Sequence, residues 1–130
     1  MLKMLVAEDD MVSRKMMSKI LNEYGECDLV VNGIEAIDAY LIALEENDPY
    51  DLVFLDIMMP KLDGIKALKT IRDFENQHKV KKAAKIIMLT ALTETEVVDD
   101  SFSKGADAYA TKPVDIDKLI DVMRKLELVK

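Results

Sequence analysis

Six polar residues stand at the ends of short apolar runs in this chain, or just after them. They are Glu8, Asp9, Asp10, Asp56, Thr90 and Lys112. Carboxylates that gather in one place repel each other unless one is protonated or a cation lies among them. Oxygen ligands suit Mg²⁺, which retains water molecules and readily takes a phosphate oxygen into its coordination shell. The residue types therefore predict a magnesium site that handles a phosphoryl group.

The charges of such a site balance. The carboxylates of Glu8, Asp9 and Asp56 match the charge of one Mg²⁺ together with the ammonium of Lys112. If the carboxylate of Asp56 attacks phosphorus, it becomes an acyl phosphate with a charge of about −2. The excess negative charge then draws in a further donor, such as the Thr90 hydroxyl. We therefore expect a phosphoryl acceptor whose modification switches the protein between two conformations.

Each of these residues also has a structural interpretation when taken alone. An acid that follows a strand often caps the next helix, and this is the interpretation we favour for Asp10. Thr90 alone would more often be a satisfied core hydroxyl, and Lys112 alone a solvated lysine. The chemical interpretation depends on the coincidence of suitable residue types at the ends of several apolar runs.

Short apolar runs alternate with helical patterns along the chain. The runs are typical of strands buried on both faces of a sheet, and they are Leu2–Ala7, Asp28–Val31, Leu52–Leu55, Ile86–Leu89 and Ala108–Ala110. The first predicted helix has Met16, Met17, Ile20, Leu21 and Tyr24 on one side and stops at Gly25. Apolar spacing predicts further helices around Ile34–Leu44, Ile65–Phe74 and Ile116–Leu126. A more lightly packed fourth helix is predicted from the capping box of Thr93 and Glu96 to Gly105.

The alternation predicts an α/β fold, a doubly wound parallel sheet of five strands covered on both faces by five helices. The right-handed crossover rule favours the strand order 2-1-3-4-5. All the polar residues named above then lie at the carboxyl edge of the sheet, where ligands bind in such folds. Because strands 1 and 3 are neighbours in this order, Asp9 and Asp56 should face each other across about 5 Å.

Composition limits the other functions that the chain could have. The 130 residues fit one domain, 1–130, and we expect no output domain. The net charge of −7 disfavours nucleic acid as a direct partner, and the basic stretch His78–Lys85 reads as a solvated connector. The single Cys27 and the lack of an apolar segment of membrane-spanning length favour a cytoplasmic protein with no membrane association.

Four stretches of the sequence closely resemble the response-regulator receiver family of two-component systems. They are MLVAEDD, DLVFLDIMMPKLDG, IIMLTAL and GADAYATKP. The resemblance covers essentially the whole chain and implies a flavodoxin-like fold in a stand-alone receiver similar to the chemotaxis regulators. It implies a phosphoacceptor switch rather than an enzyme, one that assists its own phosphorylation and dephosphorylation.

The resemblance also implies a role for each site residue. Asp56 would accept the phosphoryl group from a phosphohistidine on a sensor histidine kinase or a histidine phosphotransfer protein. Mg²⁺ would be bound directly by Asp9 and Asp56, mainly through water by Glu8, and by the backbone carbonyl of Met58. Lys112 and Thr90 would contact the phosphoryl oxygens.

Tyr109 matches the switch aromatic of the family, and Pro113 matches a position with a cis Lys–Pro bond. The signal would reach a separate downstream protein through the face made by the fourth helix, fifth strand and fifth helix. The sequence departs from the family pattern at Glu8, where Asp is commoner, at Val114, and in the long connection between Asp56 and Thr90.

Three other interpretations are less favoured. An aspartyl-phosphate hydrolase would need a second acid two residues after Asp56, where this chain has Met58. A flavin-binding domain would need a glycine- and hydroxyl-rich loop after the first strand, where the acids begin. A receiver that serves only as an unphosphorylated docking module remains open, although no required residue is missing.

Overall fold

The fold is known from a computed structural model, and the structure describes every residue except 92–98 and 101. The helices and strands alternate along the chain in the order β1 (Leu2–Ala7), α1 (Met11–Leu21), β2 (Gly25–Val30), α2 (Gly33–Glu45), β3 (Leu52–Asp56), α3 (Gly64–Gln77), β4 (Lys85–Thr90), β5 (Ala108–Thr111) and α5 (Ile116–Lys125). The predicted fourth helix, from Thr93 to Gly105, falls largely on residues outside the described part of the chain.

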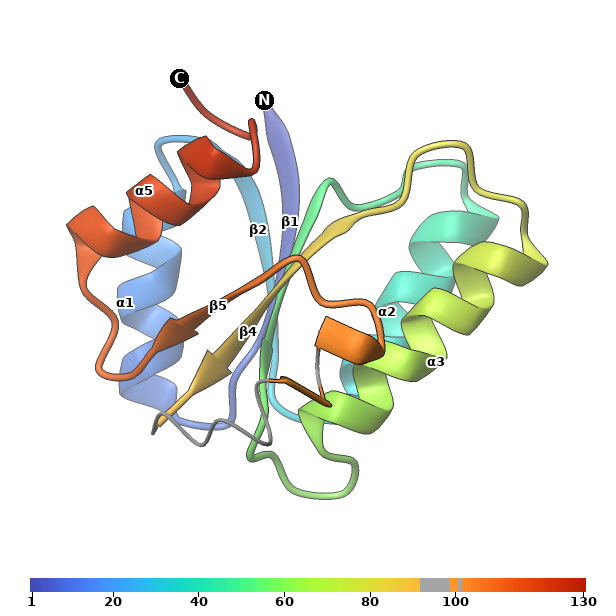
Figure 1. Cartoon of the computed structure of the whole chain (residues 1–130), viewed down its shortest axis with the longest axis horizontal. Helices are drawn as coiled ribbons and strands as arrows, with labels where there is room; N and C mark the ends of the chain where they lie inside the picture. The colour runs from blue at the N-terminus through green and yellow to red at the C-terminus, as the bar shows by residue number, and fades with distance from the viewer. Residues whose placement is uncertain (92–98, 101) are drawn as a thin grey trace.

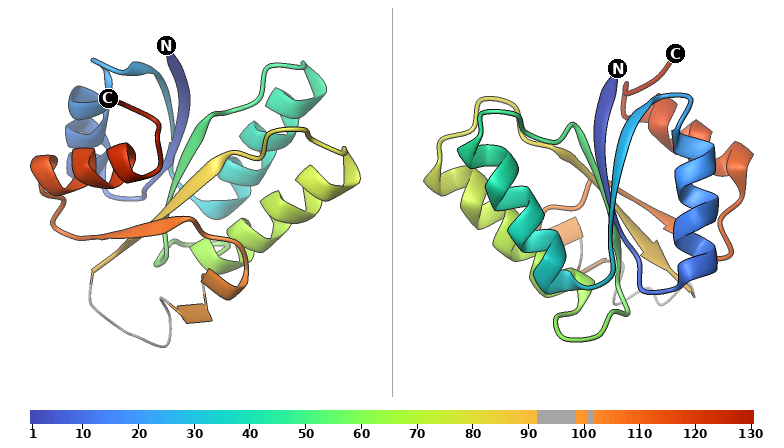
Figure 2. Two further views of the ribbon diagram at one scale, coloured as in Figure 1. Left: turned by 45° about the horizontal axis from the view of Figure 1, so that its top comes forward. Right: turned by 180° about the vertical axis from the view of Figure 1, so that it is seen from behind.

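The strands form one parallel sheet in the order β2-β1-β3-β4-β5, which confirms the predicted topology. Helices α2 and α3 lie together on one face of the sheet, and α1 and α5 cover the other (Figures 1 and 2). None of the helices in the described part of the chain is both long and apolar enough to span a bilayer.

Strand β3 shows why the core has two halves. Its side chains alternate between the faces, so that Val53 and Leu55 pack with α2 and α3, while Leu52 and Phe54 pack with α1 and α5. All four are fully buried. Burial of one such side chain contributes about 1.5–3 kcal/mol, which holds the central strand and the acid that ends it in place.

Every complete helix begins with a capping side chain. Asp10, Asn32, Asp63 and Asp115 each accept a hydrogen bond from the backbone N–H three residues later. This satisfies donors that a helix N-terminus would otherwise leave unpaired. The predicted capping role of Asp10 is confirmed.

The end of the first helix was predicted wrongly. Helix α1 ends at Leu21, and the N–H of Tyr24 bonds to the carbonyl of Leu21 in a tight turn rather than continuing the helix. Gly25 opens β2 instead of stopping the helix, and β2 starts three residues earlier than predicted. The start of this strand was missed because the exposed Glu26 interrupts the apolar pattern, which is possible at the edge of the sheet, where water accepts polar side chains.

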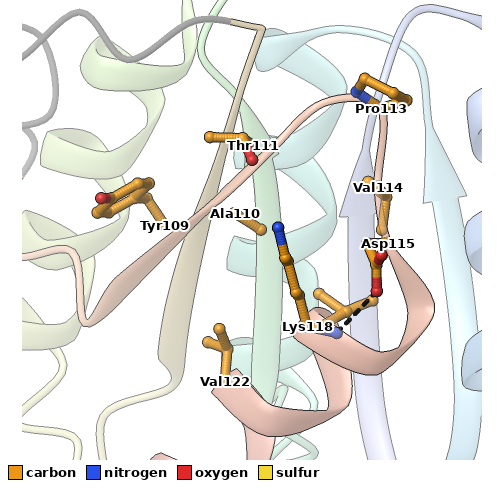
Figure 3. A pocket seen from close by; sticks show the side chains of 9 residues that line it. Tyr109, Ala110, Thr111, Pro113, Val114, Asp115, Lys118 and Val122 are labelled. Carbon is orange, nitrogen blue, oxygen red and sulfur yellow. Dashed lines mark hydrogen bonds between the residues drawn. The ribbon is translucent and has the colours of Figure 1, made fainter.

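A groove of about 280 Å³ lies between β5 and α5. Tyr109 and Thr111 line it from the strand, Lys118 and Val122 line it from the helix, and Pro113 lies in the connection between them (Figure 3). Tyr109 has an exposed fraction of 40%. The last strand therefore presents an accessible edge of mixed polar and apolar character.

Candidate functional site

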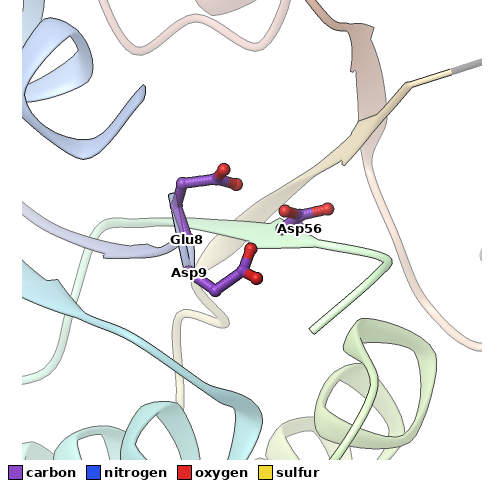
Figure 4. Close-up of side chains that lie close together, drawn as sticks. All are labelled: Glu8, Asp9 and Asp56. Carbon is purple, nitrogen blue, oxygen red and sulfur yellow. The ribbon is translucent and has the colours of Figure 1, made fainter. Parts of the chain in front are cut away.

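Three carboxylates meet at the carboxyl edge of the sheet. Glu8 and Asp9 follow β1, and Asp56 ends β3 beside it. The parallel register pairs Ala7 with Leu55, which brings the next residues of both strands side by side. One oxygen from each carboxylate lies within 4.8 Å of the other two (Figure 4). The predicted approach of Asp9 to Asp56 is therefore confirmed.

Lys112 supplies the positive charge of this cluster. Its Nζ lies 2.6 Å from Oδ2 of Asp56 and 2.9 Å from the carboxylate of Glu8. The N–H of Lys112 also bonds to the carbonyl of Thr90 at 2.7 Å, which ties the end of β5 to the end of β4. The Lys112–Pro113 peptide bond is cis, as predicted. Residues 104 positions apart thus meet in one ion-paired cluster.

Burial sets the electrostatics of the cluster. Glu8 is fully buried and Asp56 nearly so, while Asp9 is exposed. Burial, and then the contact with Asp56, raise the pKa of Glu8 from its usual 4.5 to about 7, against the opposing effect of Lys112. Burial by itself would lower the pKa of Lys112, but its hydrogen bonds to Asp56 and Glu8 outweigh this and raise it. The paired Lys112 therefore stays protonated at neutral pH.

The donor set fits a hard divalent cation. Nζ of Lys112 lies 2.9 Å from both oxygens of Glu8 and 2.6 Å from Oδ2 of Asp56, so two buried carboxylates share one cation. A single ammonium balances one of these two negative charges, and a further cation at the cluster would balance the other. Glu8, Asp9 and Asp56 offer only oxygen atoms, as Mg²⁺ prefers, and the exposed Asp9 leaves the cluster open on one side.

The connection after β3 holds Asp56 in a defined orientation. The N–H of Met58 donates to Oδ1 of Asp56 at 3.1 Å, so Oδ1 and Oδ2 face different partners. The connection closes when the N–H of Gly64 bonds to the carbonyl of Ile57 at 3.0 Å. A Cβ atom on Gly64 would lie 2.2 Å from the Asp56 carbonyl oxygen, so only glycine allows this approach.

The two predicted switch residues differ in their surroundings. Thr90 is 7% exposed at the end of β4, close to the Lys112 backbone. Tyr109 on β5 is paired with Met88 in the sheet register, and its ring meets Phe102 edge to face at 6.1 Å between centroids. Thr90 therefore lies beside the carboxylate cluster, and Tyr109 lies on the outer surface of the last strand.

Arg14 contacts the site in a way that the sequence analysis missed. Its Nη1 donates to the carbonyl oxygens of Glu8, at 2.9 Å, and Asp9, at 2.8 Å. The sequence gives no signal for a bond from a side chain to a backbone carbonyl. Arg14 lies six residues after Glu8, and its contact with the Glu8 carbonyl depends on where α1 begins, which the sequence does not state.

The sequence matches a known protein family, and the strand order and the carboxylate cluster are consistent with that family. Residues 4–124 match the family model described as the response regulator receiver domain. The chain belongs to this family of phosphoacceptor domains of two-component signalling.

Known relatives of the chain include both stand-alone proteins and larger ones. The chemotaxis protein CheY of Halobacterium salinarum is 35% identical over 122 residues, which cover 93% of this chain and 92% of that protein. Hybrid signal transduction histidine kinase K of Dictyostelium discoideum is 32% identical over 121 residues, which cover 90% of this chain but only 10% of the kinase. The chain thus spans about a tenth of that kinase and nearly all of that CheY.

Solved structures of receiver domains superimpose closely on this fold. In the CheX–CheY–BeF3–Mg²⁺ complex from Borrelia burgdorferi, the matched chain has a TM-score of 0.84 and 30% identity, with coverage of 99% of this chain and 90% of that one. A chain in the complex of the Saccharomyces cerevisiae histidine phosphotransfer protein Ypd1 with the receiver domain of Ssk1 matches with a TM-score of 0.83 and 25% identity, covering 98% and 92%.

Proposed function

We propose that Asp56 is the phosphoryl acceptor of this receiver domain. The ion pair of 2.6 Å between Lys112 Nζ and Asp56 Oδ2 carries this proposal, because it joins the predicted nucleophile to the cation that would hold a phosphoryl oxygen. Asp56 would attack phosphorus with a carboxylate oxygen, form an acyl phosphate and release the donor group. Oδ1, held by the N–H of Met58, would keep the carboxylate from turning.

Mg²⁺ is the cation that fits the carboxylate cluster. Asp9, Asp56 and the carbonyl of Met58 would hold it directly, and Glu8 would hold it mainly through water. When bound, Mg²⁺ supplies charge that neutralises and orients the phosphoryl oxygens. Lys112 is bonded to both Asp56 and Glu8 and would balance the charge that arrives with the phosphoryl group.

The donor would be a phosphohistidine on a sensor histidine kinase or a histidine phosphotransfer protein. The Ypd1 complex is an example of such a partner for another receiver domain. In this chain the accessible Asp9 leaves one side of the cluster open to an incoming imidazole phosphate. The chain itself would act as a switch that assists its own phosphorylation rather than as an enzyme acting on other substrates. We place it in the cytoplasm, as one receiver domain over residues 1–130.

The output surface would include β5 and α5. Thr90 would move toward the phosphoryl oxygens, and the Tyr109 ring, 40% exposed, would then turn inward. An aromatic ring changes its free energy by about 1–3 kcal/mol on burial, which shifts a two-state population by about 5- to 150-fold. The groove beside Tyr109 would change shape with the ring and would meet a separate downstream protein.

Phosphorylation by a small donor tests the acceptor. Acetyl phosphate with Mg²⁺ should add one labile phosphoryl group to the wild-type protein, detected by intact-mass spectrometry. The Asp56→Asn variant should remain unmodified, whereas Asp73→Asn, which removes an exposed acid from α3, should react as wild type does. A labile phosphate on the Asn variant would falsify the assignment.

Amide chemical shifts with beryllofluoride and Mg²⁺ test the output surface, because this complex mimics the acyl phosphate. We expect shifts around Asp9, Asp56 and Lys112, together with shifts in β5 near Tyr109. Shifts limited to the carboxyl-edge loops would mean that β5 does not carry the signal.

A further inference from the structure

The connection from β1 to α1 carries two of the three acids of the site and has a cation of its own. Arg14 is in the first turns of α1, and its guanidinium reaches back over the connection. A single nitrogen, Nη1, donates to the carbonyl oxygens of Glu8 and Asp9 at 2.9 and 2.8 Å. The Arg14 N–H also bonds to the carbonyl of Asp10. Three consecutive carbonyl groups of the acidic segment are therefore held by one residue.

These bonds fix the peptide planes on both sides of Asp9. The two planes set the direction of the Asp9 Cα–Cβ bond and limit the rotamers that its carboxylate can adopt. Asp9 is the exposed member of the cluster and has no core packing to orient it. Glu8 and Asp56, by contrast, are held by burial and by Lys112. Arg14 thus supplies the constraint that packing does not give to Asp9.

We infer that Arg14 is a positioning residue for metal binding, one that aims the Asp9 carboxylate through the backbone and does not touch the metal. The inference rests on the proposed function, since it requires Mg²⁺ at the cluster. Residues that orient metal ligands in this way change metal affinity by about 10–100-fold when they are lost.

The positive charge of Arg14 should weaken Mg²⁺ binding, whereas its bonds to the backbone should strengthen it. A guanidinium near the site repels Mg²⁺, so loss of the charge alone would tighten Mg²⁺ binding. Loss of the positioning bonds would weaken it. The sign of the change in Mg²⁺ affinity therefore separates the two effects without reference to any activity.

The experiment is an NMR titration of the protein with Mg²⁺, followed through backbone amides of the carboxyl-edge loops. Arg14→Met keeps the apolar stem and removes the nitrogens, and we expect its affinity for Mg²⁺ to fall by about 10–100-fold. Arg14→Lys retains one cationic nitrogen, which can donate to both carbonyls, and should restore part of the loss. Lys15→Ala removes an equal charge from the next, exposed residue of α1 and should bind Mg²⁺ as wild type or slightly better.

The result that overturns the inference is an Arg14→Met variant that is folded and binds Mg²⁺ as tightly as wild type or more tightly. If Arg14→Met does not fold, Arg14→Lys decides, because it keeps the charge: a folded Lys variant that binds Mg²⁺ more weakly than wild type would support positioning, and a folded Lys variant with wild-type affinity would overturn it. A wild-type protein that does not bind Mg²⁺ would instead overturn the proposed metal site, and the inference with it.

Discussion

Neighbouring acids of this chain have different tasks because their surroundings differ. Asp9 points into the carboxylate cluster, whereas the side chain of Asp10 accepts hydrogen bonds from the N–H and the hydroxyl of Ser13 at 2.9 and 2.8 Å. The Ser13 backbone bond, and then its hydroxyl, lower the pKa of Asp10, which remains ionised at the start of α1. One acid is thus available to a cation and the other stabilises a helix.

Substitution of these two acids should affect different properties. Asp9→Asn should sharply weaken Mg²⁺ binding at little cost in stability, because this side chain is exposed. Asp10→Ala should leave Mg²⁺ binding nearly unchanged but lower the free energy of unfolding, because a cap is lost. Calorimetric Mg²⁺ titration and urea unfolding measure the two properties. Equal losses of Mg²⁺ affinity in both variants would contradict the assignment.

The raised pKa of Glu8 makes stability depend on pH when no metal is present. Between its usual pKa of 4.5 and about 7, the folded protein holds a proton that the unfolded chain has released. Stability from this group is therefore complete below pH 4.5 and is lost as the pH rises through 7, by an amount on the order of 3 kcal/mol. Glu8→Gln cannot release a proton and should escape this loss.

The measurement is urea unfolding in the presence of EDTA at several pH values between about 4 and 8. Wild type should lose stability relative to Glu8→Gln as the pH rises. Curves that run parallel over this range would mean that folding does not change the pKa of Glu8.

At the scale of elements, the carboxyl ends of the strands position the site and the starts of the helices constrain it. Helix α3 begins at Gly64, which lies against the backbone of Asp56. Gly33, at the start of α2, approaches the Leu62 carbonyl in the same manner, with an added Cβ at 2.2 Å. The connection from β3 to α3 is therefore confined between two helix N-termini.

A methyl group at position 64 should disturb the backbone of Asp56. In Gly64→Ala the new Cβ would lie 2.2 Å from the Asp56 carbonyl oxygen, so the end of β3 or the start of α3 must shift. We expect a loss of about 1–3 kcal/mol in unfolding free energy, together with slower phosphorylation by acetyl phosphate. Lys66→Ala, at an exposed position two residues further along α3, is the control. Wild-type stability and rate in Gly64→Ala would show that the turn is not constrained.

The elements themselves were largely predictable. The strand order follows from the alternation of buried runs and helical patterns, and the strand-end acids follow from that order. The early start of β2 was not predictable, because the exposed Glu26 interrupts the apolar pattern before Asp28 in this edge strand. The contact of Gly64 with the Asp56 backbone was not predictable either. A glycine in a sequence permits a close approach of another backbone segment but does not show which segment approaches it.

At the scale of the whole molecule, a second ionic network joins elements that the site does not reach. Arg72 on α3 pairs with Glu75 at 2.6 Å and with Asp107 at 2.9 Å, and it donates to the carbonyls of Ala84 and Gly105. Glu75 is 6% exposed and also accepts from the buried hydroxyl of Tyr40 on α2. The network connects α2, α3, the start of β4 and the residues before β5.

Loss of the Arg72 charge should destabilise the molecule strongly, because Glu75 would remain buried without its cation. For Arg72→Met we expect a loss of about 3–5 kcal/mol in the free energy of unfolding, measured in urea. Lys69→Met, which removes the exposed pair of Lys69 with Asp73 on the same helix, should change it by less than about 1 kcal/mol. Similar values for the two variants would mean that the buried network contributes no more than a surface ion pair.

The sequence gives no signal for the ionic network around Arg72. Arg72 and Glu75 read as the polar side of an amphipathic helix, and Asp107 lies 35 positions from Arg72. Only the packing of α3 against the sheet brings them together. The gathering of Glu8, Asp9, Asp56 and Lys112 was predictable by contrast, since they stand at or just after the ends of parallel strands, which meet at one edge whatever their separation in the chain.

The central claim is that the phosphoryl group resides on Asp56, and reduction of the acyl phosphate locates it most directly. Borohydride converts an aspartyl phosphate to homoserine, which peptide mass spectrometry can place. After treatment with acetyl phosphate and Mg²⁺, homoserine should replace aspartate at position 56 and nowhere else, and it should be absent without the donor. Homoserine at position 9, or a phosphorylated protein that yields none at position 56, would contradict the account.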